Sequence, residues 1–393
     1  MEINKPDLLI VGSGLYGLTM ARRYVDEFHG NVLVLEKRDH IGGNAWSSID
    51  AETGIEIHNY GSHLFHTSNS RVIDFISRFT EFNDYKHTVY SIAKGQVYSL
   101  PVNLLTISQI FQKALRPEEA KNLIQEEINQ MLELINDIDY SLESKALSSI
   151  GKTMYELLIK GYTKKQWQID PSELPASVIT RLPVRYNYDN SYFHDKFQGL
   201  PVNGYAKMLE NISNHPRIRI ITNFDYFGSL WEHNLDLIKV YTGPLDRFYS
   251  YKHGRLKWRT LDFEIERLPI QDFQGTSVVN YADENVPYTR IHEFKHLHPE
   301  RDYSKNKTII MKEFSRISKI EDEPYYPVNS ISDRELLLKY RELAKSEKNV
   351  FFGGRLGTYK YLDMDMAIAS ALINFDQEVK PAIKSLDLHQ TTD

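Results

Sequence analysis

Residues 8–17 read LLIVGSGLYG, a short apolar run followed by three glycines. The apolar run at 8–11 predicts a buried strand, and the residues after it predict a helix at 18–28 and a second buried strand at 31–35. A strand, a helix and a second strand in this order form the basic unit of a doubly wound α/β sheet. We therefore expect an α/β fold of the Rossmann type at the start of the chain.

The glycines of this stretch indicate a nucleotide ligand. Gly12, Gly14 and Gly17 allow a tight turn after the strand and let a pyrophosphate approach the N-terminus of the helix. Glu36 follows the second strand, where its carboxylate can accept hydrogen bonds from a ribose hydroxyl. A tight turn without a ligand is the alternative interpretation of the glycines.

A second pair of glycines, Gly42 and Gly43 in EKRDHIGGN, follows soon after this acid. That pattern resembles the amine-oxidase-like branch of FAD proteins. The late GGR at 353–355 resembles the turn with which such folds close over the flavin. FAD is therefore favoured over NAD as the cofactor.

Length and composition exclude several other classes. At roughly 150 residues per domain, 393 residues predict two or three domains. The net charge of −6 argues against nucleic acid as a partner, and the lack of Cys excludes disulfides, thiolate nucleophiles and Cys-bound metals. The first glycine follows only four apolar residues, too few for a signal peptide or a membrane span, so we expect a cytoplasmic protein without membrane insertion.

The middle of the chain predicts other structures. From 104 to 160 the apolar residues recur at helical spacing, with a possible capping box at Thr153 and Glu156, which indicates a helical insertion. From 218 to 311, segments such as RIRII, LIKVY and KTIIM predict a mostly antiparallel sheet. A last strand at 350–352 and a helix at 364–375 return to the initial pattern, so the first domain is expected to be discontinuous.

Three other patterns have competing interpretations. Arg181 and Arg290 lie among apolar and aromatic residues, where each is either an anion ligand or part of a structural salt bridge. HEFKH at 292–296 matches a zinc-protease pattern, but Pro287 and Pro299 flank it without a helical stripe, and we expect no zinc. The histidines His58, His63 and His66 could bind a metal or form a packed loop beneath a cofactor; we favour the loop and expect no metal.

Eight segments in order carry a family resemblance: GSGLYGL, EKRDHIGGN, YGSHLFHT, KGYTKKQW, RLPVRY, VPYTRIHE, DEPYYPVN and GGRLGTYKYLDM. Together they span nearly the whole chain and resemble the UDP-galactopyranose mutase family. KQWQ and His87 resemble the mycobacterial and corynebacterial branch. The sequence departs from the enteric pattern at two positions: Gln168 stands where that pattern has Gly after the Trp, and His87 stands where Asn is common. These departures leave loop flexibility and the fine sugar contacts open, but not the reaction.

The resemblance implies three domains. They are a discontinuous FAD-binding domain, a helical bundle, and an antiparallel sheet domain with a mobile loop near 166–177. Their expected boundaries are 1–84, 200–245 and 330–393 for the first, 103–165 for the second, and 85–102, 166–199 and 246–329 for the third.

The resemblance also implies the site residues. Arg181, Arg290 and His66 are expected to be catalytic, and the two arginines to hold the substrate diphosphate. The expected substrate contacts are Leu158, Tyr162, Thr163, Trp167, Arg181, Tyr192, Asn280, Arg290, Tyr326 and Tyr361. The expected FAD contacts are Gly12, Ser13, Gly14, Tyr16, Gly17, Glu36, Lys37, Gly43, Asn44, His63, Leu64, Arg355, Leu362, Asp363 and Met364.

The implied reaction interconverts UDP-galactopyranose and UDP-galactofuranose without net redox, through a covalent adduct of the sugar with reduced FAD. It would supply galactofuranose for cell-wall or surface polysaccharide, and the enzyme is expected to be a homo-oligomer, most simply a dimer. Three rivals remain open: a mutase for UDP-N-acetylgalactosamine, an amine-oxidase-like redox flavoenzyme, and a flavin-bound protein without catalysis.

Overall fold

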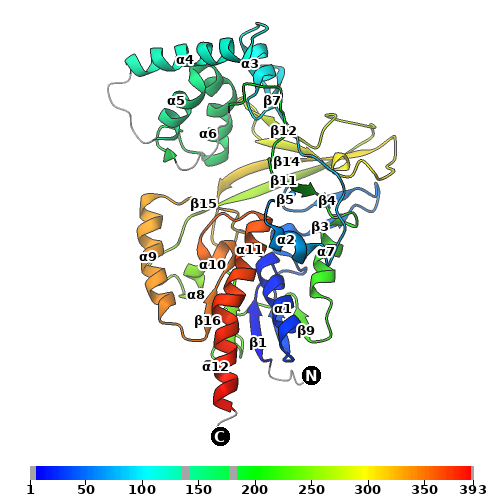
Figure 1. The fold of residues 1–393 in the computed structure, drawn as a ribbon, viewed down its shortest axis with the longest axis vertical. Coiled ribbons are helices and arrows are strands. Elements are labelled where there is room, and N and C mark those ends of the chain that lie inside the picture. Colours follow the sequence, from blue (N-terminus) through cyan, green and yellow to red (C-terminus); the bar gives the residue numbers. More distant parts are fainter. Residues whose placement is uncertain (1–5, 135–140, 177–183, 391–393) are drawn as a thin grey trace.

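The computed structural model describes residues 6–134, 141–176 and 184–390. Figure 1 shows three parts along the long axis: a helical part at one end, a large sheet across the middle, and a second sheet with its helices at the other end. Every predicted site residue except Arg181 lies within the described residues.

The second of these sheets has five parallel strands. Its order is β16 (Val350–Phe352), β10 (Ile238–Tyr241), β1 (Leu8–Val11), β2 (Val32–Leu35) and β9 (Ile218–Ile221). Leu8 and Ile10 of β1 pack toward one face and Leu9 and Val11 toward the other, as the alternation of a strand requires. Because both faces are covered, the strand is apolar along its whole length.

The helices α1 (Leu15–Glu27), α11 (Met364–Asn374) and α12 (Lys380–Gln390) cover one face of this sheet, with the π-helical segment Phe375–Val379 between the last two. The segments RIRII and LIKVY form β9 and β10 of the parallel sheet, which corrects the expectation that they belong to the antiparallel one. Their β-branched residues predict a strand, but the choice of partner strand depends on tertiary packing.

The middle sheet has seven strands, antiparallel except at the β12–β6 pair. Their order is β15 (Tyr326–Pro327), β11 (Trp258–Leu268), β14 (Thr308–Ile317), β13 (Arg290–Glu293), β12 (Val278–Tyr281), β6 (Val89–Ala93) and β7 (Gln96–Leu100). KTIIM, at the start of β14, lies in this sheet as expected.

The helical part contains α3 (Leu104–Ile110), α4 (Pro117–Leu134), α5 (Leu142–Met154), the π-helical segment Tyr155–Lys160 and α6 (Gly161–Trp167). Its apolar residues form one core with residues of β6 and β7. The capping box at Thr153 is wrong: the backbone kink lies at Gly151, whose φ is 76°, and the Thr153 side chain donates to Glu127 of α4 instead.

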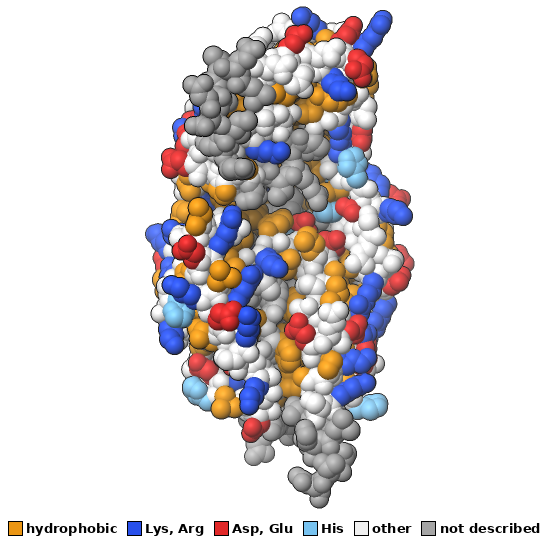
Figure 2. All heavy atoms as spheres, turned by 60° about the vertical axis from the view of Figure 1, so that its left-hand side comes forward, with side chains coloured by type: hydrophobic (Ala, Val, Ile, Leu, Met, Phe, Trp, Pro, Cys, Tyr) orange, Lys and Arg blue, Asp and Glu red, His pale blue; other side chains and the backbone are white. Residues whose placement is uncertain are grey.

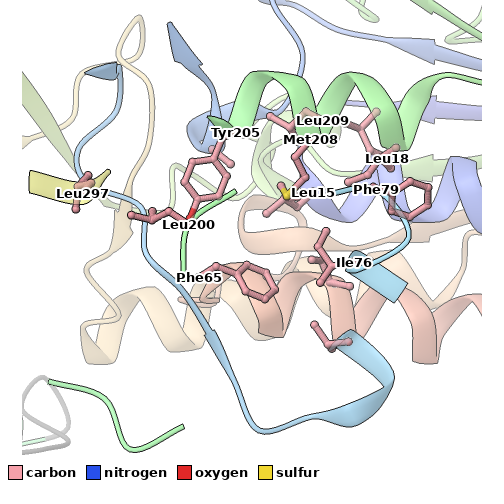
Figure 3. Packing of buried hydrophobic residues seen from close by; sticks show 14 of the residues in the cluster. Leu15, Leu18, Phe65, Ile76, Phe79, Leu200, Tyr205, Met208, Leu209 and Leu297 are labelled. Atoms are coloured by element: carbon pink, nitrogen blue, oxygen red, sulfur yellow. The ribbon is translucent and has the colours of Figure 1, made fainter. Parts of the chain in front are cut away.

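Further elements lie outside the two main sheets and the helical part. They are the 3-10 turn Gly43–Ala45, β3 (Ser47–Ile49), β4 (Glu56–His58), β5 (Phe65–Thr67), α2 (Ser70–Ile76), β8 (Phe197–Gly199), α7 (Gly204–Ser213), α8 (Leu245–Phe248), the 3-10 turn Phe294–Leu297, α9 (Ile331–Lys345) and α10 (Gly354–Thr358). Figure 3 shows how Leu15 of α1, Phe65 of β5 and Met208 of α7 meet in one buried cluster. This cluster packs β5, and so positions the loop before it, against α1.

Within the described residues, none of the helices is both long and apolar enough to cross a membrane. On the face that Figure 2 shows, acidic and basic side chains are interspersed.

Candidate active site

A cavity of about 530 Å³ opens where β1 passes into α1. Gly12 has a φ of +98°, and a Cβ on it would lie 2.1 Å from Thr242 Oγ1. A Cβ on Gly17 would lie 2.1 Å from the carbonyl oxygen of Gly12, so helix and turn are in close contact. At Gly14 a Cβ would meet no protein atom within 4 Å, because this residue faces the cavity.

Glu36 lines the same cavity and is held in place by its neighbours. Its Oε2 accepts hydrogen bonds from the Ser13 amide at 2.8 Å and the Ser13 hydroxyl at 2.6 Å, and its Oε1 accepts one from the Arg38 amide at 2.9 Å. Ser13 is completely buried, so it orients the carboxylate rather than contacting a ligand. The acid and the glycine turn together fit the ribose and pyrophosphate of a dinucleotide.

Tyr16, Lys37, Gly43 and Leu362 also line this first cavity. A second cavity of about 610 Å³ adjoins it, and both are lined by Asn44, His63, Arg355, Asp363 and Met364. A ligand that extends through the first cavity can therefore place its far end at the wall of the second.

The middle sheet forms one wall of the second cavity. The strand register sets Asn280 of β12 beside Arg290 of β13, and Arg290 beside Glu313 of β14. All three residues line the cavity, and the buried Oδ1 of Asn280 has no hydrogen-bond partner in the protein. This row therefore offers a cation and an unused acceptor to a polar ligand.

Arg290 is held by two groups. Its Nε lies 3.4 Å from Glu313 Oε1, and its Nη2 donates to the Tyr162 hydroxyl of α6. Burial would lower the pKa of Arg290, but the charge of Glu313 raises it, while burial would raise the pKa of Glu313 and the charge of Arg290 lowers it to about 2. Both groups are therefore charged at neutral pH, and Arg290 remains 30% exposed in the cavity wall.

The helix α6 and the tyrosines complete the cavity. Thr163, Trp167, Tyr192, Tyr326 and Tyr361 line it, with Tyr326 and Tyr361 stacked at 5.8 Å. Lys165 ties α6 to the sheet, because its Nζ donates to the carbonyl oxygens of Tyr281 at 2.6 Å and Tyr288 at 3.0 Å. Trp167 is the last residue of α6, and Gln168 follows in the left-handed region with a φ of 53°.

Two predicted residues are not placed in this wall. Leu158 is buried in the core of the helical part, whereas its neighbour Ile159 lines the cavity. Arg181 lies outside the described residues.

The rings of the histidines near β4 and β5 make different hydrogen bonds and do not point at one common atom. His58 Nδ1 accepts the His63 amide at 3.0 Å, His63 Nδ1 donates to the Gly61 carbonyl at 2.6 Å, and His66 Nδ1 lies 2.8 Å from Asp195 Oδ2. Burial lowers the pKa of His58 to about 3 and that of His63 to about 4, so both are neutral at pH 7. His63, Leu64 and His66 line the second cavity, as a packed loop beside a cofactor would.

HEFKH is a strand followed by a 3-10 turn, so its histidines do not share a helical face. His292 contacts Glu313, whereas His296 contacts Asp272 and Glu293. Lys295 Nζ lies 3.5 Å from Asp272 and 3.7 Å from Glu293, which makes this second group an ion-pair cluster.

Several residues of the second cavity were not predicted from the sequence, namely Ser62, Gln166, Phe193, Glu313 and Tyr325. Burial of Glu313 could have been predicted from the alternation of residues in its strand. Glu313 follows Ile309 and Met311 at every second position of a strand, so it lies on their buried face, and a buried carboxylate needs a partner.

The chain is similar to proteins of known families. A model of the UDP-galactopyranose mutase family matches residues 157–361, and a model of NAD(P)-binding Rossmann-like domains matches residues 10–79. A probable UDP-galactopyranose mutase of Klebsiella pneumoniae is 45% identical, with 95% of each chain covered. A dTDP-fucopyranose mutase of Escherichia coli is 43% identical, covering 93% of this chain and 96% of the relative.

Among solved structures, a reduced UDP-galactopyranose mutase matches with a TM-score of 0.75 at 14% identity, over 96% of this chain and 97% of the other. This likeness confirms the α/β fold with its Rossmann-like unit. The identity and coverage of the Klebsiella relative, together with the family model, show that the chain belongs to the UDP-galactopyranose mutase family.

Proposed function

We propose that this protein interconverts UDP-galactopyranose and UDP-galactofuranose with FAD as its cofactor. The observation that carries the proposal is the pair of adjoining cavities, one with a dinucleotide turn and the other with Arg290 in its wall. The family membership gives this geometry its substrate class.

The first cavity fits FAD. Gly14 would leave room for the pyrophosphate, Glu36 would accept a hydrogen bond from a ribose hydroxyl, and the residues shared by both cavities would surround the ring system. When bound and reduced, the flavin would supply a nucleophile for the anomeric carbon of the sugar. The protein's own contribution is to orient both partners and to stabilise charge.

Arg290 would bind the diphosphate and stabilise the negative charge that develops as UDP departs. Tyr162 and Glu313 keep its guanidinium in the cavity wall. Arg181 would be the second arginine, an assignment that rests on the family resemblance alone. Trp167 would shield the nucleotide from water, and His66, held by Asp195 and stacked on Phe193 at 3.6 Å, would form part of the flavin wall.

The wider assignments belong to the same proposal. They are the three domains at the boundaries predicted from the sequence, a dimer, a cytoplasmic enzyme, and a supply of galactofuranose for surface polysaccharide. They rest on the resemblance to the family.

A second candidate substrate is dTDP-fucopyranose, because the Escherichia coli relative named for it covers nearly the whole chain. It differs from UDP-galactopyranose by lacking the ribose 2′-hydroxyl and the sugar 6-hydroxyl and by carrying a methyl group on the base. Loss of a hydrogen bond to a buried polar group costs roughly tenfold or more, so kcat/KM values for the two substrates should differ by at least that factor.

The test uses purified protein reduced with dithionite. UDP-galactopyranose, dTDP-fucopyranose and UDP-N-acetylgalactosamine are each incubated with it, and the furanose product is separated by chromatography. We expect galactofuranose from the first substrate and at least about tenfold lower kcat/KM with the others.

The oxidised protein is the control and should be inactive, because oxidised flavin lacks the nucleophilic lone pair. Equal activity in the oxidised state would contradict the mechanism. Turnover that consumes oxygen would instead identify a redox flavoenzyme.

A further inference from the structure

His292 belongs to the HEFKH pattern but has no role in the proposed reaction. Its imidazole is 1% exposed and makes two hydrogen bonds with different parts of the fold. Nδ1 lies 2.7 Å from the hydroxyl of Ser62, in the loop between β4 and β5. Nε2 lies 3.1 Å from Oε2 of Glu313 in β14.

Glu313 also pairs with Arg290, and Arg290 donates a hydrogen bond to the Tyr162 hydroxyl of α6. The chain of contacts therefore starts at the loop beside His63, which lines both cavities, and ends at the helix that carries Trp167. These contacts link the residues between the two cavities to Arg290 in the wall of the second cavity.

We propose that His292 is a positioning residue, which holds the loop at 59–64 and the Glu313–Arg290 pair in a fixed relation across the two cavities. Its role in turnover rests on the proposed function. The hydrogen-bonded arrangement itself does not, since it is a property of the protein's own side chains.

The direction of each hydrogen bond follows from charge. Glu313 is paired with Arg290 and is a carboxylate at neutral pH, so it can only accept. Burial lowers the pKa of His292 despite its bond to Glu313, so the ring is neutral and carries its single proton on Nε2. Nδ1 must then accept the proton of the Ser62 hydroxyl.

This arrangement makes the neutral tautomer of His292 essential. A side chain that donates to Glu313 and accepts from Ser62 can replace it, whereas a ring of similar size without nitrogen cannot. Glutamine has a donor and an acceptor at its tip, and phenylalanine has neither. A role in packing alone would favour phenylalanine, because His292 packs parallel to Phe294 at 5.8 Å.

The experiment compares four variants of the FAD-loaded protein. His292→Phe should lower kcat/KM at least about tenfold and weaken UDP binding in calorimetry by a similar factor, because Glu313 Oε2 loses the donor that holds it, while Oε1 keeps its contacts with Thr289 and Arg290. His292→Gln should retain both within about threefold. Ser62→Ala should lower kcat by about threefold or more while the Kd for UDP stays within about twofold, since only the loop end of the chain is cut.

His296→Gln is the matched control, because this histidine lies in the same HEFKH segment but has Asp272 and Glu293, rather than Glu313 or Ser62, as its ion-pair partners. It should match the wild type in kcat, in KM and in UDP binding. FAD content and melting temperature are measured for all four variants.

Nitrogen NMR of the wild-type protein, labelled at histidine, gives a readout that needs neither turnover nor a folded His292→Phe variant. The His292 signal, assigned by its loss in His292→Gln, should show a proton on Nε2 alone at pH 7. A proton on Nδ1, or equal kinetics and UDP binding in the Phe and Gln variants, would overturn the proposal. If the wild type does not convert UDP-galactopyranose, the proposed function fails, while the tautomer and UDP binding still decide the role of His292.

Discussion

Arg290 and Glu313 form an ion pair in which Arg290 is far more accessible from the cavity than Glu313. Taking both charges out of water costs several kcal/mol, and their attraction offsets that cost only while the pair is intact. Glu313 is 2% exposed, whereas Arg290 keeps a solvent-accessible face in the cavity. A ligand anion can therefore reach Arg290 without displacing Glu313.

Replacement of Arg290 by Ala should lower kcat/KM at least about tenfold, because hydrogen bonds to charged groups contribute roughly 1.5 to 3 kcal/mol. If Arg290 stabilises the departing UDP, kcat falls along with any rise in KM. Arg290→Lys should rescue only partly, since a point charge cannot reproduce the bidentate contact. Steady-state kinetics on the reduced enzyme measure both effects.

We expect the same result for Arg181→Ala if the two arginines share the diphosphate. FAD content serves as the control in both variants and should not change. Near wild-type kinetics in both alanine variants would mean that the arginines are structural and that the UDP assignment is misplaced.

The turn between β1 and α1 combines two glycines with different physical roles. Gly17 has no room for a side chain, because its Cβ would lie 2.1 Å from a backbone oxygen. Gly14 has room within the protein, since no protein atom lies within 4 Å of its Cβ position. Ligand binding and folding can therefore be separated at this turn.

Gly14→Ala should fold with a melting temperature close to that of the wild type but bind less FAD, because the added methyl group enters the space for the pyrophosphate. Gly17→Ala should lower the melting temperature itself, because backbone must shift to accept it. Absorbance of the purified protein and calorimetry of the apo form measure the two quantities. Full FAD content in a stable Gly14→Ala variant would place the pyrophosphate elsewhere.

The elements that could be predicted from the sequence are those with a local signal. The apolar runs at 8–11 and 350–352 are strands with these same bounds, and GSGLYG predicts the turn because Gly12 adopts a positive φ and Gly17 has no room for a side chain. The partners of RIRII and LIKVY could not be predicted from their own residues, because apolar strand residues do not specify which sheet buries them; only the family resemblance assigned 200–245 to the FAD-binding domain. Ser62 and His292 could not be paired either, since 230 residues separate them in the chain.

At the scale of the whole molecule, the two cavities adjoin at a junction where both are lined by Asn44, His63, Arg355, Asp363 and Met364. His63 of the loop at 59–64 lines this junction, His87 lines the second cavity, and His58 of β4 lies beside His63. Burial lowers the pKa of His58 and His87 to about 3 and that of His63 to about 4, from an ordinary value of 6.5. These groups link the stability of the junction to pH.

Because the folded pKa values are lowered, the unfolded chain binds protons below pH 6.5 that the folded chain does not bind until about pH 4. The free energy of unfolding should therefore be highest above pH 6.5 and fall on acidification by up to about 1.4 kcal/mol per pH unit for each group. Glu313 adds a loss of the same sign below about pH 4.5, as the pH approaches its folded pKa of about 2. His296 acts in the opposite direction, because Glu293 and Asp272 raise its pKa despite burial.

His58→Asn tests this linkage, because the amide oxygen can still accept the His63 amide while the titrating ring is gone. Urea unfolding between pH 7 and 5 should give a slope that is smaller than that of the wild type by about 1 kcal/mol per pH unit. His233→Asn, at an exposed position, is the control and should keep the wild-type slope. An unchanged slope in His58→Asn would mean that the ring takes up a proton as readily in the folded protein as in the unfolded chain, so that the interior accommodates a positive charge beside Glu56.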